Sequence, residues 1–186
     1  MEFDGVVLAG GTARRLGGED KASLRIGGRS LLDRAIDALD DAGRVIVVGP
    51  RRSTLRPVSW TREAPAGAGP LAATAAGVEH VVAESLVVLA VDYPFVDANV
   101  VAALLGAIED HDGAALTDDE GNFHYVAGAY RTASVRAGLK RRDRDEAASM
   151  RGVFASLDVV AVHDDRAALD IDYPEDLEAA RRIAGG

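Results

Sequence analysis

The most constraining feature of this sequence is a glycine-rich, basic segment that follows directly from its first apolar run. Residues 8–21 read Leu-Ala-Gly-Gly-Thr-Ala-Arg-Arg-Leu-Gly-Gly-Glu-Asp-Lys, and the apolar run Phe3–Ala9 has the length and β-branched content of a buried strand. Glycines after a strand let backbone N–H groups approach a ligand closely and point at its phosphates. The charges of Arg14, Arg15 and Lys21 suit phosphate oxygens. The segment predicts a phosphate-binding loop; the alternative is an ordinary strand-to-helix turn with solvated arginines.

Two better-known phosphate loops do not fit this segment. A Walker loop needs a glycine directly before its lysine, and no glycine precedes Lys21. The dinucleotide fingerprint G-x-G-x-x-G is also missing, because the glycines stand in adjacent pairs at 10–11 and 17–18. The segment therefore indicates a third kind of nucleotide site. Lys21 and Lys140 are the two lysines among 21 basic residues, and a compact ammonium differs chemically from the guanidinium used elsewhere.

Composition limits the class of protein. A chain of 186 residues is long enough for one domain with a full core. The absence of cysteine excludes disulfides and thiolate chemistry, and the acidic start Met1–Asp4 is unlike a signal peptide, so we expect a cytoplasmic protein. Apolar runs such as Leu86–Val91 are far shorter than a membrane span. The net charge of −9 argues against nucleic acid as a partner, although a local basic loop and a metal still suit a small phosphorylated ligand.

The order of apolar segments predicts the fold class. Strands alternate with helical patterns through the first half, which indicates βαβ units, and Ser85–Val91 has the near-continuous apolar character of a strand buried on both faces. The pattern then changes to a hairpin-like pair of segments, Ala114–Thr117 and Phe123–Tyr130. A late strand at Val159–His163 and a terminal helix opened by Pro174 complete the chain. The prediction is a three-layer α/β domain with a mostly parallel sheet and a small hairpin insertion.

Asp92 is the second candidate functional residue. It directly follows the predicted strand Ser85–Val91, and ligands of open parallel sheets bind outside the carboxyl ends of the strands. A carboxylate there can hold Mg²⁺, although a turn aspartate before Pro94 is the alternative. Next to a phosphate loop on the same sheet edge, the metal interpretation is favoured. Asp170 and Asp172 are less clear, because Asp172 suits either a helix cap or a second carboxylate facing the metal, and the cap is favoured.

Other polar residues do not form a recognisable motif. The four histidines lie far apart and lack the spacing of metal ligands. The acidic turn Asp118–Glu120 lacks the periodicity of a calcium loop, which favours a solvated hairpin tip. There is no G-x-S-x-G element for a serine hydrolase.

The ordered motifs resemble the MobA-like nucleotidyltransferases, specifically the molybdenum cofactor guanylyltransferases. The loop at 8–21 is similar to the signature of that family, and Gly69–Ala72, Asp92–Pro94 and Asp172–Leu177 resemble its later motifs in the same order. The resemblance covers nearly the whole chain and implies a Rossmann-like nucleotidyltransferase fold. We therefore expect one nucleotidyltransferase domain over 1–186, whose nucleotide-binding half spans about 1–95 and whose acceptor half spans about 96–186.

The resemblance also implies a reaction. The terminal phosphate of Mo-molybdopterin would attack the α-phosphorus of GTP, giving the guanine dinucleotide cofactor and pyrophosphate. Such a transfer needs positioning and neutralisation of charge, which loop amides, Lys21 and Mg²⁺ at Asp92 can supply. A molybdoenzyme or another protein of cofactor biosynthesis is the implied protein partner. The alternatives are a transferase that uses CTP or another phosphorylated acceptor, and a nucleotide-binding regulator without turnover.

Site residues follow from the resemblance position by position. The first strand and its loop would contact the nucleotide through Leu8, Ala9, Gly10 and Gly11. Lys21 and Arg15 would contact phosphates, and Asp92 would bind both the metal and the nucleotide. One departure concerns the aspartate that the family commonly has after its third core strand, since this chain has Ala64 there and Glu63 beside it. Glu63 is the candidate replacement, and the identity of the nucleotide depends on it.

Overall fold

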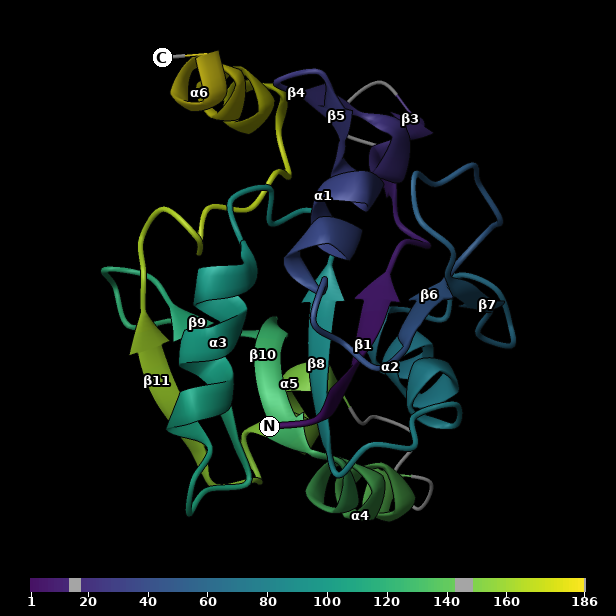
Figure 1. Ribbon diagram of the computed structural model, residues 1–186, viewed down its shortest axis with the longest axis vertical. Helices are drawn as coiled ribbons and strands as arrows, with labels where there is room; N and C mark the ends of the chain where they lie inside the picture. The colour runs from purple at the N-terminus through teal and green to yellow at the C-terminus, as the bar shows by residue number, and fades with distance from the viewer. Residues whose placement is uncertain (14–17, 143–148, 186) are drawn as a thin grey trace.

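A mixed, mostly parallel sheet forms the centre of the molecule. The computed structural model describes residues 1–13, 18–142 and 149–185, and in these ranges seven strands pair in the order β11-β9-β10-β8-β1-β6-β7 (Figure 1). Among these strands β10 runs antiparallel to both of its neighbours, and the other pairings are parallel. In chain order the strands are β1 (Phe3–Leu8), β6 (Val45–Val48), β7 (Ser59–Thr61), β8 (Ser85–Ala90), β9 (Gly113–Thr117), β10 (Phe123–Arg131) and β11 (Val159–His163).

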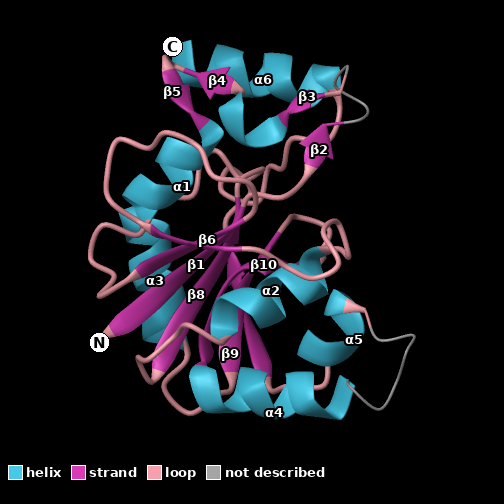
Figure 2. Cartoon of the chain, turned by 90° about the vertical axis from the view of Figure 1, so that its right-hand side faces the viewer, coloured by secondary structure: helices cyan, strands magenta, loops and turns pink. Residues whose placement is uncertain are grey.

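Helices cover both faces of the sheet. Figure 2 shows the sheet between two helical layers, with α1 (Leu31–Ala38) and α3 (Ala98–Ala107) on one side. The other side carries α2 (Pro70–Val78), α4 (Thr132–Arg142) and α5 (Met150–Phe154). The last helix, α6 (Pro174–Gly185), packs beside β4 (Arg25–Ile26), which pairs with β5 (Arg29–Ser30). The predicted three-layer α/β architecture is confirmed.

No helix in the described part of the chain is both long enough and apolar enough to cross a membrane.

Apolar burial explains why β1 and β8 lie at the centre. Every residue of both strands is buried, as the near-continuous apolar runs predict. The polar exception in β1 is Asp4, whose carboxylate accepts hydrogen bonds from the backbone N–H groups of Val82 and Ala83 at 2.7 and 3.1 Å. Gly77 of α2 allows the helix to lie directly on β1, because a Cβ at that position would overlap the side chain of Val6. These contacts hold the two central strands in place, and with them the carboxyl ends at the sheet edge.

The order of the strands places a crevice at one edge of the sheet. From β1 the chain continues to β6 and β7 on one side, whereas β8 and the strands after it lie on the other side. Ligands of open α/β sheets bind at such a switch point, outside the carboxyl ends of the strands. In this protein the switch point lies between β1 and β8, so the residues that follow these two strands meet there.

The predicted hairpin is present, and its two strands belong to the central sheet. Residues of β9 and β10 pair antiparallel, and β10 also pairs with β8 from Ala127↔Leu89 onward. A register shift interrupts the pairing of β10 with β9 between His124 and Gly128. Because β10 pairs with β8 and β9 pairs in parallel with β11, the hairpin connects the first half of the sheet to its last strand.

Candidate active site

The glycine-rich segment folds back on itself. After β1, residues Thr12–Ala13 (β2) pair antiparallel with Glu19–Asp20 (β3), and a 3₁₀ turn follows at Lys21–Ser23. The hairpin returns Lys21 to the sheet edge where the loop began. Arg14 and Arg15 lie outside the described residues, so the predicted role of Arg15 stays a prediction.

A second glycine lets the start of this loop lie close to the neighbouring strand end. Gly49, which follows β6, has φ +148°, and a Cβ there would lie 2.8 Å from the carbonyl carbon and oxygen of Ala9. Ala9 is itself buried, and its N–H donates to the carbonyl oxygen of Val48 at 2.8 Å. The backbone at the predicted nucleotide contacts is therefore positioned by its neighbour strand, because only glycine tolerates this close approach.

Lys21 is held between two carboxylates from distant parts of the chain. Its Nζ donates to Asp92 Oδ2 at 3.0 Å and to Asp172 Oδ1 at 2.9 Å, and the residue is only 9% exposed. Burial by itself lowers the pKa of the Lys21 ammonium, but the charges and hydrogen bonds of the two carboxylates outweigh it and raise the pKa overall. Lys21 is therefore a buried, permanently charged ammonium at the predicted phosphate site.

Asp92 lies at the predicted end of the central strand and has one oxygen without a protein donor. Its Oδ2 accepts from Lys21, whereas Oδ1 is buried and finds no hydrogen-bond partner among the described residues. The carbonyl oxygen of Asp92 accepts from the N–H of Ile171 at 3.0 Å, which ties this loop to the segment before α6. A buried carboxylate oxygen left unpaired is costly, and a hard cation is a group that relieves it.

The segment before α6 contributes the third charged group. Asp176 accepts hydrogen bonds from the backbone N–H groups of Asp172 and Tyr173, at 3.0 and 2.7 Å. The carboxylate of Asp172 bonds Lys21, which adds a role in the site to the favoured interpretation of Asp172 as a helix cap. Burial raises the pKa of Asp170, and the nearby charges of Asp172 and Asp92 raise it further.

Lys21, Asp92 and the glycine loop line a cavity of about 580 Å³, which we call the edge cleft. It brings together six of the residues predicted from the sequence and adds others from the segment around α2 and from β10. The lining residues are Leu8, Gly10, Gly11, Lys21, Arg62, Glu63, Ala66, Gly67, Gly69, Pro70, Ala73, Ala90, Val91, Asp92 and Val126. The sequence did not predict Arg62 and Val126, and the adjacency of Arg62 to Glu63 is the local signal that could have indicated the former.

Glu63 is the acidic residue that reaches the edge cleft. It is 7% exposed, its Oε1 accepts from the N–H of Gly67 at 2.8 Å, and its Oε2 is buried without a partner among the described residues. A Cβ on Gly10 would lie 3.4 Å from Glu63 Oε1, so the carboxylate lies against the glycine loop. Ala64, at the position where the family commonly has aspartate, is exposed and does not line the cleft.

The amino end of α2 forms another wall of the edge cleft. Gly69 adopts φ +94° as the residue before the helix, and Pro70 is its first residue. The N–H groups of a first helical turn have no intrahelical acceptor and carry partial positive charge. An anion in the cleft would therefore meet the glycine loop, a helix amino terminus and the Lys21 ammonium together.

Comparisons with known proteins agree with this geometry. The family model described as "MobA-like NTP transferase domain" matches residues 5–162. The chain belongs to this family. The "Probable molybdenum cofactor guanylyltransferase" of Opitutus terrae is 33% identical over 192 aligned positions, which cover 96% of this chain and 94% of that protein. The "Molybdenum cofactor guanylyltransferase" of Shewanella sp. (strain ANA-3) is 31% identical over 126 positions, covering 65% of this chain and 64%, less than two thirds, of that protein.

Solved structures support the fold of this MobA-like chain. "Molybdopterin-guanine dinucleotide biosynthesis protein A" from Archaeoglobus fulgidus superposes with a TM-score of 0.77 at 21% identity, covering 98% of both chains. The 2-C-methyl-D-erythritol 4-phosphate cytidylyltransferase from Thermus thermophilus gives a TM-score of 0.75 at 24% identity, with both chains fully covered. The predicted family and the α/β nucleotidyltransferase fold are confirmed.

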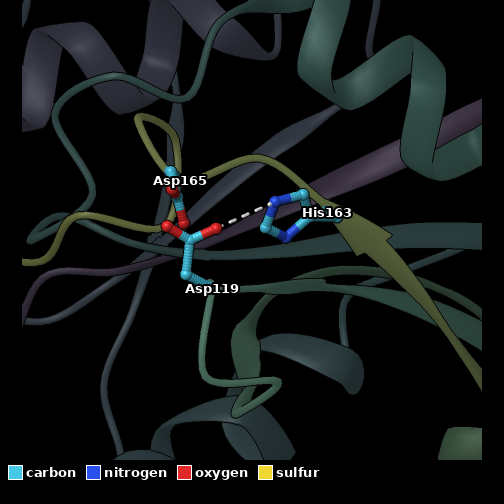
Figure 3. Close-up of side chains that lie close together, drawn as sticks. All are labelled: Asp119, His163 and Asp165. Atoms are coloured by element: carbon cyan, nitrogen blue, oxygen red, sulfur yellow. Dashed lines mark ion pairs between the residues drawn. The ribbon is translucent and has the colours of Figure 1, made fainter.

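A second group of charged residues lies away from the edge cleft of this MobA-like fold. Figure 3 shows Asp119, His163 and Asp165, and we call these residues the exposed cluster. One ligand atom from each lies within 4.8 Å of the others, and His163 Nε2 is 3.3 Å from Asp119 Oδ1. The pairing of β11 with β9 brings His163 beside the turn that contains Asp119, which spacing along the sequence could not show. All three side chains are exposed, and we assign no site to them.

Proposed function

We propose that this protein transfers GMP from GTP to the terminal phosphate of Mo-molybdopterin, giving the guanine dinucleotide cofactor and pyrophosphate. The names of the Opitutus and Shewanella relatives support the reaction. The observation that carries the proposal is the edge cleft itself, in which Lys21, Asp92 and Glu63 meet the glycine loop. These groups supply what nucleotidyl transfer needs, namely donors for phosphates, a carboxylate for a metal and an acceptor for the base.

The nucleotide phosphates would lie between the glycine loop and the amino end of α2. The N–H groups of Gly10 and Gly11, the helix terminus and Lys21 then neutralise charge that develops on the phosphates. Arg15 is proposed to contact the phosphates as well. The ammonium of Lys21 stays protonated through the neutral range because its carboxylate partners raise its pKa, so it acts by position and charge and not as an acid or base.

Asp92 is the proposed ligand of Mg²⁺. Its unpaired, buried Oδ1 fits a hard cation, and Asp172 lies on the other side of Lys21 as a second carboxylate. When bound, Mg²⁺ withdraws charge from the phosphates and stabilises the pyrophosphate leaving group. A phosphate nucleophile is already ionised at neutral pH, so no general base is required of the protein.

Glu63 is the proposed reader of the base. Guanine presents two adjacent donors, N1–H and the 2-amino group, whereas neither adenine nor cytosine offers that pair. The unpaired Glu63 Oε2 in the edge cleft can accept such a donor, and leaving it unpaired with another base carries a desolvation cost. Leu8, Ala9, Gly10 and Gly11 are proposed to contact the nucleotide beside it.

In this proposal each half of the single domain binds one of the two substrates. Residues 1–95 bind the nucleotide, and residues 96–186 contribute to binding of the acceptor substrate. We place the reaction in the cytoplasm, because a chain without cysteine suits a reducing compartment in which disulfides are not used. A molybdoenzyme or a cofactor-biosynthesis protein is the proposed recipient of the product.

Titration calorimetry with GTP, ATP and CTP in the presence of Mg²⁺ tests the nucleotide. We expect GTP to bind tightest to the natural protein. In Glu63→Gln, the amide oxygen can keep the bond to Gly67 N–H while the amide nitrogen replaces Oε2, so the preference for GTP over ATP should fall by roughly 10- to 100-fold, as for loss of a charged acceptor. Glu79→Gln, on an exposed residue after α2, is the matched control.

Two outcomes would contradict this proposal in different ways. CTP bound at least as tightly as GTP would replace the guanylyl assignment with a cytidylyl one. Pyrophosphate release that stays at background with every nucleotide and with Mo-molybdopterin present would make the protein a nucleotide-binding regulator instead of an enzyme.

A further inference from the structure

Four aromatic side chains form a continuous row that leads from the core to the surface beside the edge cleft. Tyr130 and Phe154 meet edge to face at 4.7 Å between ring centroids, and Phe154 contacts Tyr125 at 6.2 Å. Tyr125 then stacks on Phe123 at 5.5 Å, with the two ring planes only 10° apart. The chain has nine aromatic residues, so nearly half of them gather in this aromatic row.

The aromatic row becomes more exposed toward one end. Tyr130 and Phe154 are fully buried, Tyr125 is partly buried, and Phe123 is 38% exposed. The hydroxyl of Tyr130 donates to the carbonyl oxygen of Tyr125 at 2.8 Å, which fixes the strand that carries the outer rings. Phe123 is thus an aromatic side chain held in place by the rings behind it, with part of its surface open to a ligand.

The position of the aromatic row relates it to the edge cleft. Val126 of β10 lines the cleft together with Asp92, and Phe123 lies three residues earlier, about 10 Å along an extended strand. The hydroxyl of Tyr93, next to Asp92, is 3.0 Å from His124 Nδ1, which fastens this part of β10 to the Asp92 loop. Phe123 is therefore within reach of a ligand that also contacts Asp92.

The row also lies on the same side of the sheet as the cleft. Phe154 belongs to α5, and Pro70 and Ala73 of the cleft belong to α2, which covers the same face (Figure 2). Across the sheet edge the order is then Glu63 after β7, Lys21 and Asp92 near β1 and β8, and the aromatic row on β10. A base, a chain of phosphates and a second planar ring would occupy these three positions in sequence.

We propose that Phe123, supported by Tyr125, is the stacking platform for a planar, fused heteroaromatic ring of the acceptor, whose phosphate reaches the Asp92 end of the cleft. This inference rests on the proposed function, because it assigns the acceptor's pterin ring to a surface of the described chain. Aromatic side chains stack on heteroaromatic rings without needing a particular hydrogen-bond pattern, and offset stacking suits the flat outer face of Phe123. The acceptor is thereby aligned with its phosphate directed at the nucleotide.

A pterin probe tests the platform without any turnover. Neopterin monophosphate, which carries a phosphate on a short chain from a pterin ring, would be titrated by following the quenching of its own fluorescence. We expect saturable binding to the natural protein and a Kd about 5- to 150-fold weaker for Phe123→Ala, the range that corresponds to loss of one stacked ring. Phe123→Trp should restore binding, because it enlarges the stacking face.

The controls separate this inference from the proposed function. Leu55→Ala removes another exposed apolar side chain, 70% exposed, and should leave pterin binding unchanged. Equal binding of the probe by Phe123→Ala and the natural protein, or no binding by either, overturns the platform. If probe binding depends on Phe123 but the protein never forms the dinucleotide, the stacking platform is supported and the proposed guanylyl transfer is contradicted.

Discussion

Two charged groups in this molecule have similar composition and different surroundings. One joins Lys21 to Asp92 and Asp172 at the edge cleft, where the side chains are 11%, 23% and 48% exposed. The exposed cluster joins His163 to Asp119 and Asp165, and the first two of these side chains are 58% and 76% exposed. Both combine a basic side chain with two carboxylates, and both depend on contacts between distant segments to bring their residues together.

The difference between the two groups lies in what holds the negative charges. At the edge cleft a buried ammonium bonds both carboxylates and balances one of their two charges, and Asp92 still has an oxygen, unpaired among the described residues, that favours a cation. In the exposed cluster a hydrogen bond with Asp119 raises the pKa of Asp165, and the basic partner is a histidine in contact with solvent. Solvent screens such charges, and exposed pairs contribute little. Burial, more than composition, makes the first group a candidate for catalysis.

The largest effect is expected from Asp92→Asn, which keeps the shape of the side chain and removes its charge. A neutral amide cannot replace a carboxylate as a ligand of Mg²⁺ next to nucleotide phosphates, so Mg²⁺-dependent transfer should fall to background. Pyrophosphate release measured over a range of Mg²⁺ concentrations checks this. Asp41→Asn, on an exposed residue in the turn after α1, is the matched control, and normal turnover by folded Asp92→Asn would move the metal site elsewhere.

Lys21→Ala should have the next largest effect. Removal of one preorganised contact to the transition state typically costs about 10²–10³-fold in turnover. The substitution also leaves Asp92 and Asp172 without their shared ammonium, so some loss of thermal stability is expected in addition. Lys140→Ala changes the other lysine of the chain, which is exposed, and should behave as the natural protein in the same assay. Equal turnover by the two variants would contradict a phosphate role for Lys21.

The smallest effect is expected in the exposed cluster. His163→Ala and Asp119→Asn remove a screened surface pair that does not line the edge cleft, so turnover with GTP and the melting temperature should match those of the natural protein. Steady-state kinetics and thermal unfolding monitored by circular dichroism are sufficient. A large loss of activity in either variant would contradict the conclusion that only the buried group acts in catalysis.

The sequence predicts the parts of this structure that depend on local pattern. Apolar runs identify β1 and β8, because strands buried on both faces leave that signature, and their ends locate the glycine loop and Asp92. Glu63 comes from the family resemblance, as the acidic neighbour of the position where the family commonly has an aspartate, shortly after the end of β7. Local pattern thus indicates the fold class and the strand ends at the edge cleft, and the family resemblance adds Leu8, Gly10, Gly11 and Glu63 to its lining.

Contacts between distant segments could not be predicted in the same way. Asp172 follows the rules of a helix cap when it is read with its neighbours, and its bond to Lys21 depends on where α6 docks. The integration of β10 into the central sheet follows from its pairing with β8, and the aromatic row becomes visible only after β10 meets α5. These features arise from strand order and helix docking, which a single sequence does not encode at short range.

The bond between Lys21 and Asp172 has a consequence for synthesis of the protein. The two residues are 151 positions apart, so the bond closes a loop that contains most of the chain. The amino-terminal strands and the glycine loop emerge from the ribosome first, and domains assemble as their segments appear. Until Asp172 has left the exit tunnel, Lys21 lacks one of its two partners. A chain stalled in translation before that point therefore displays the glycine loop while Lys21 still lacks the carboxylate of Asp172.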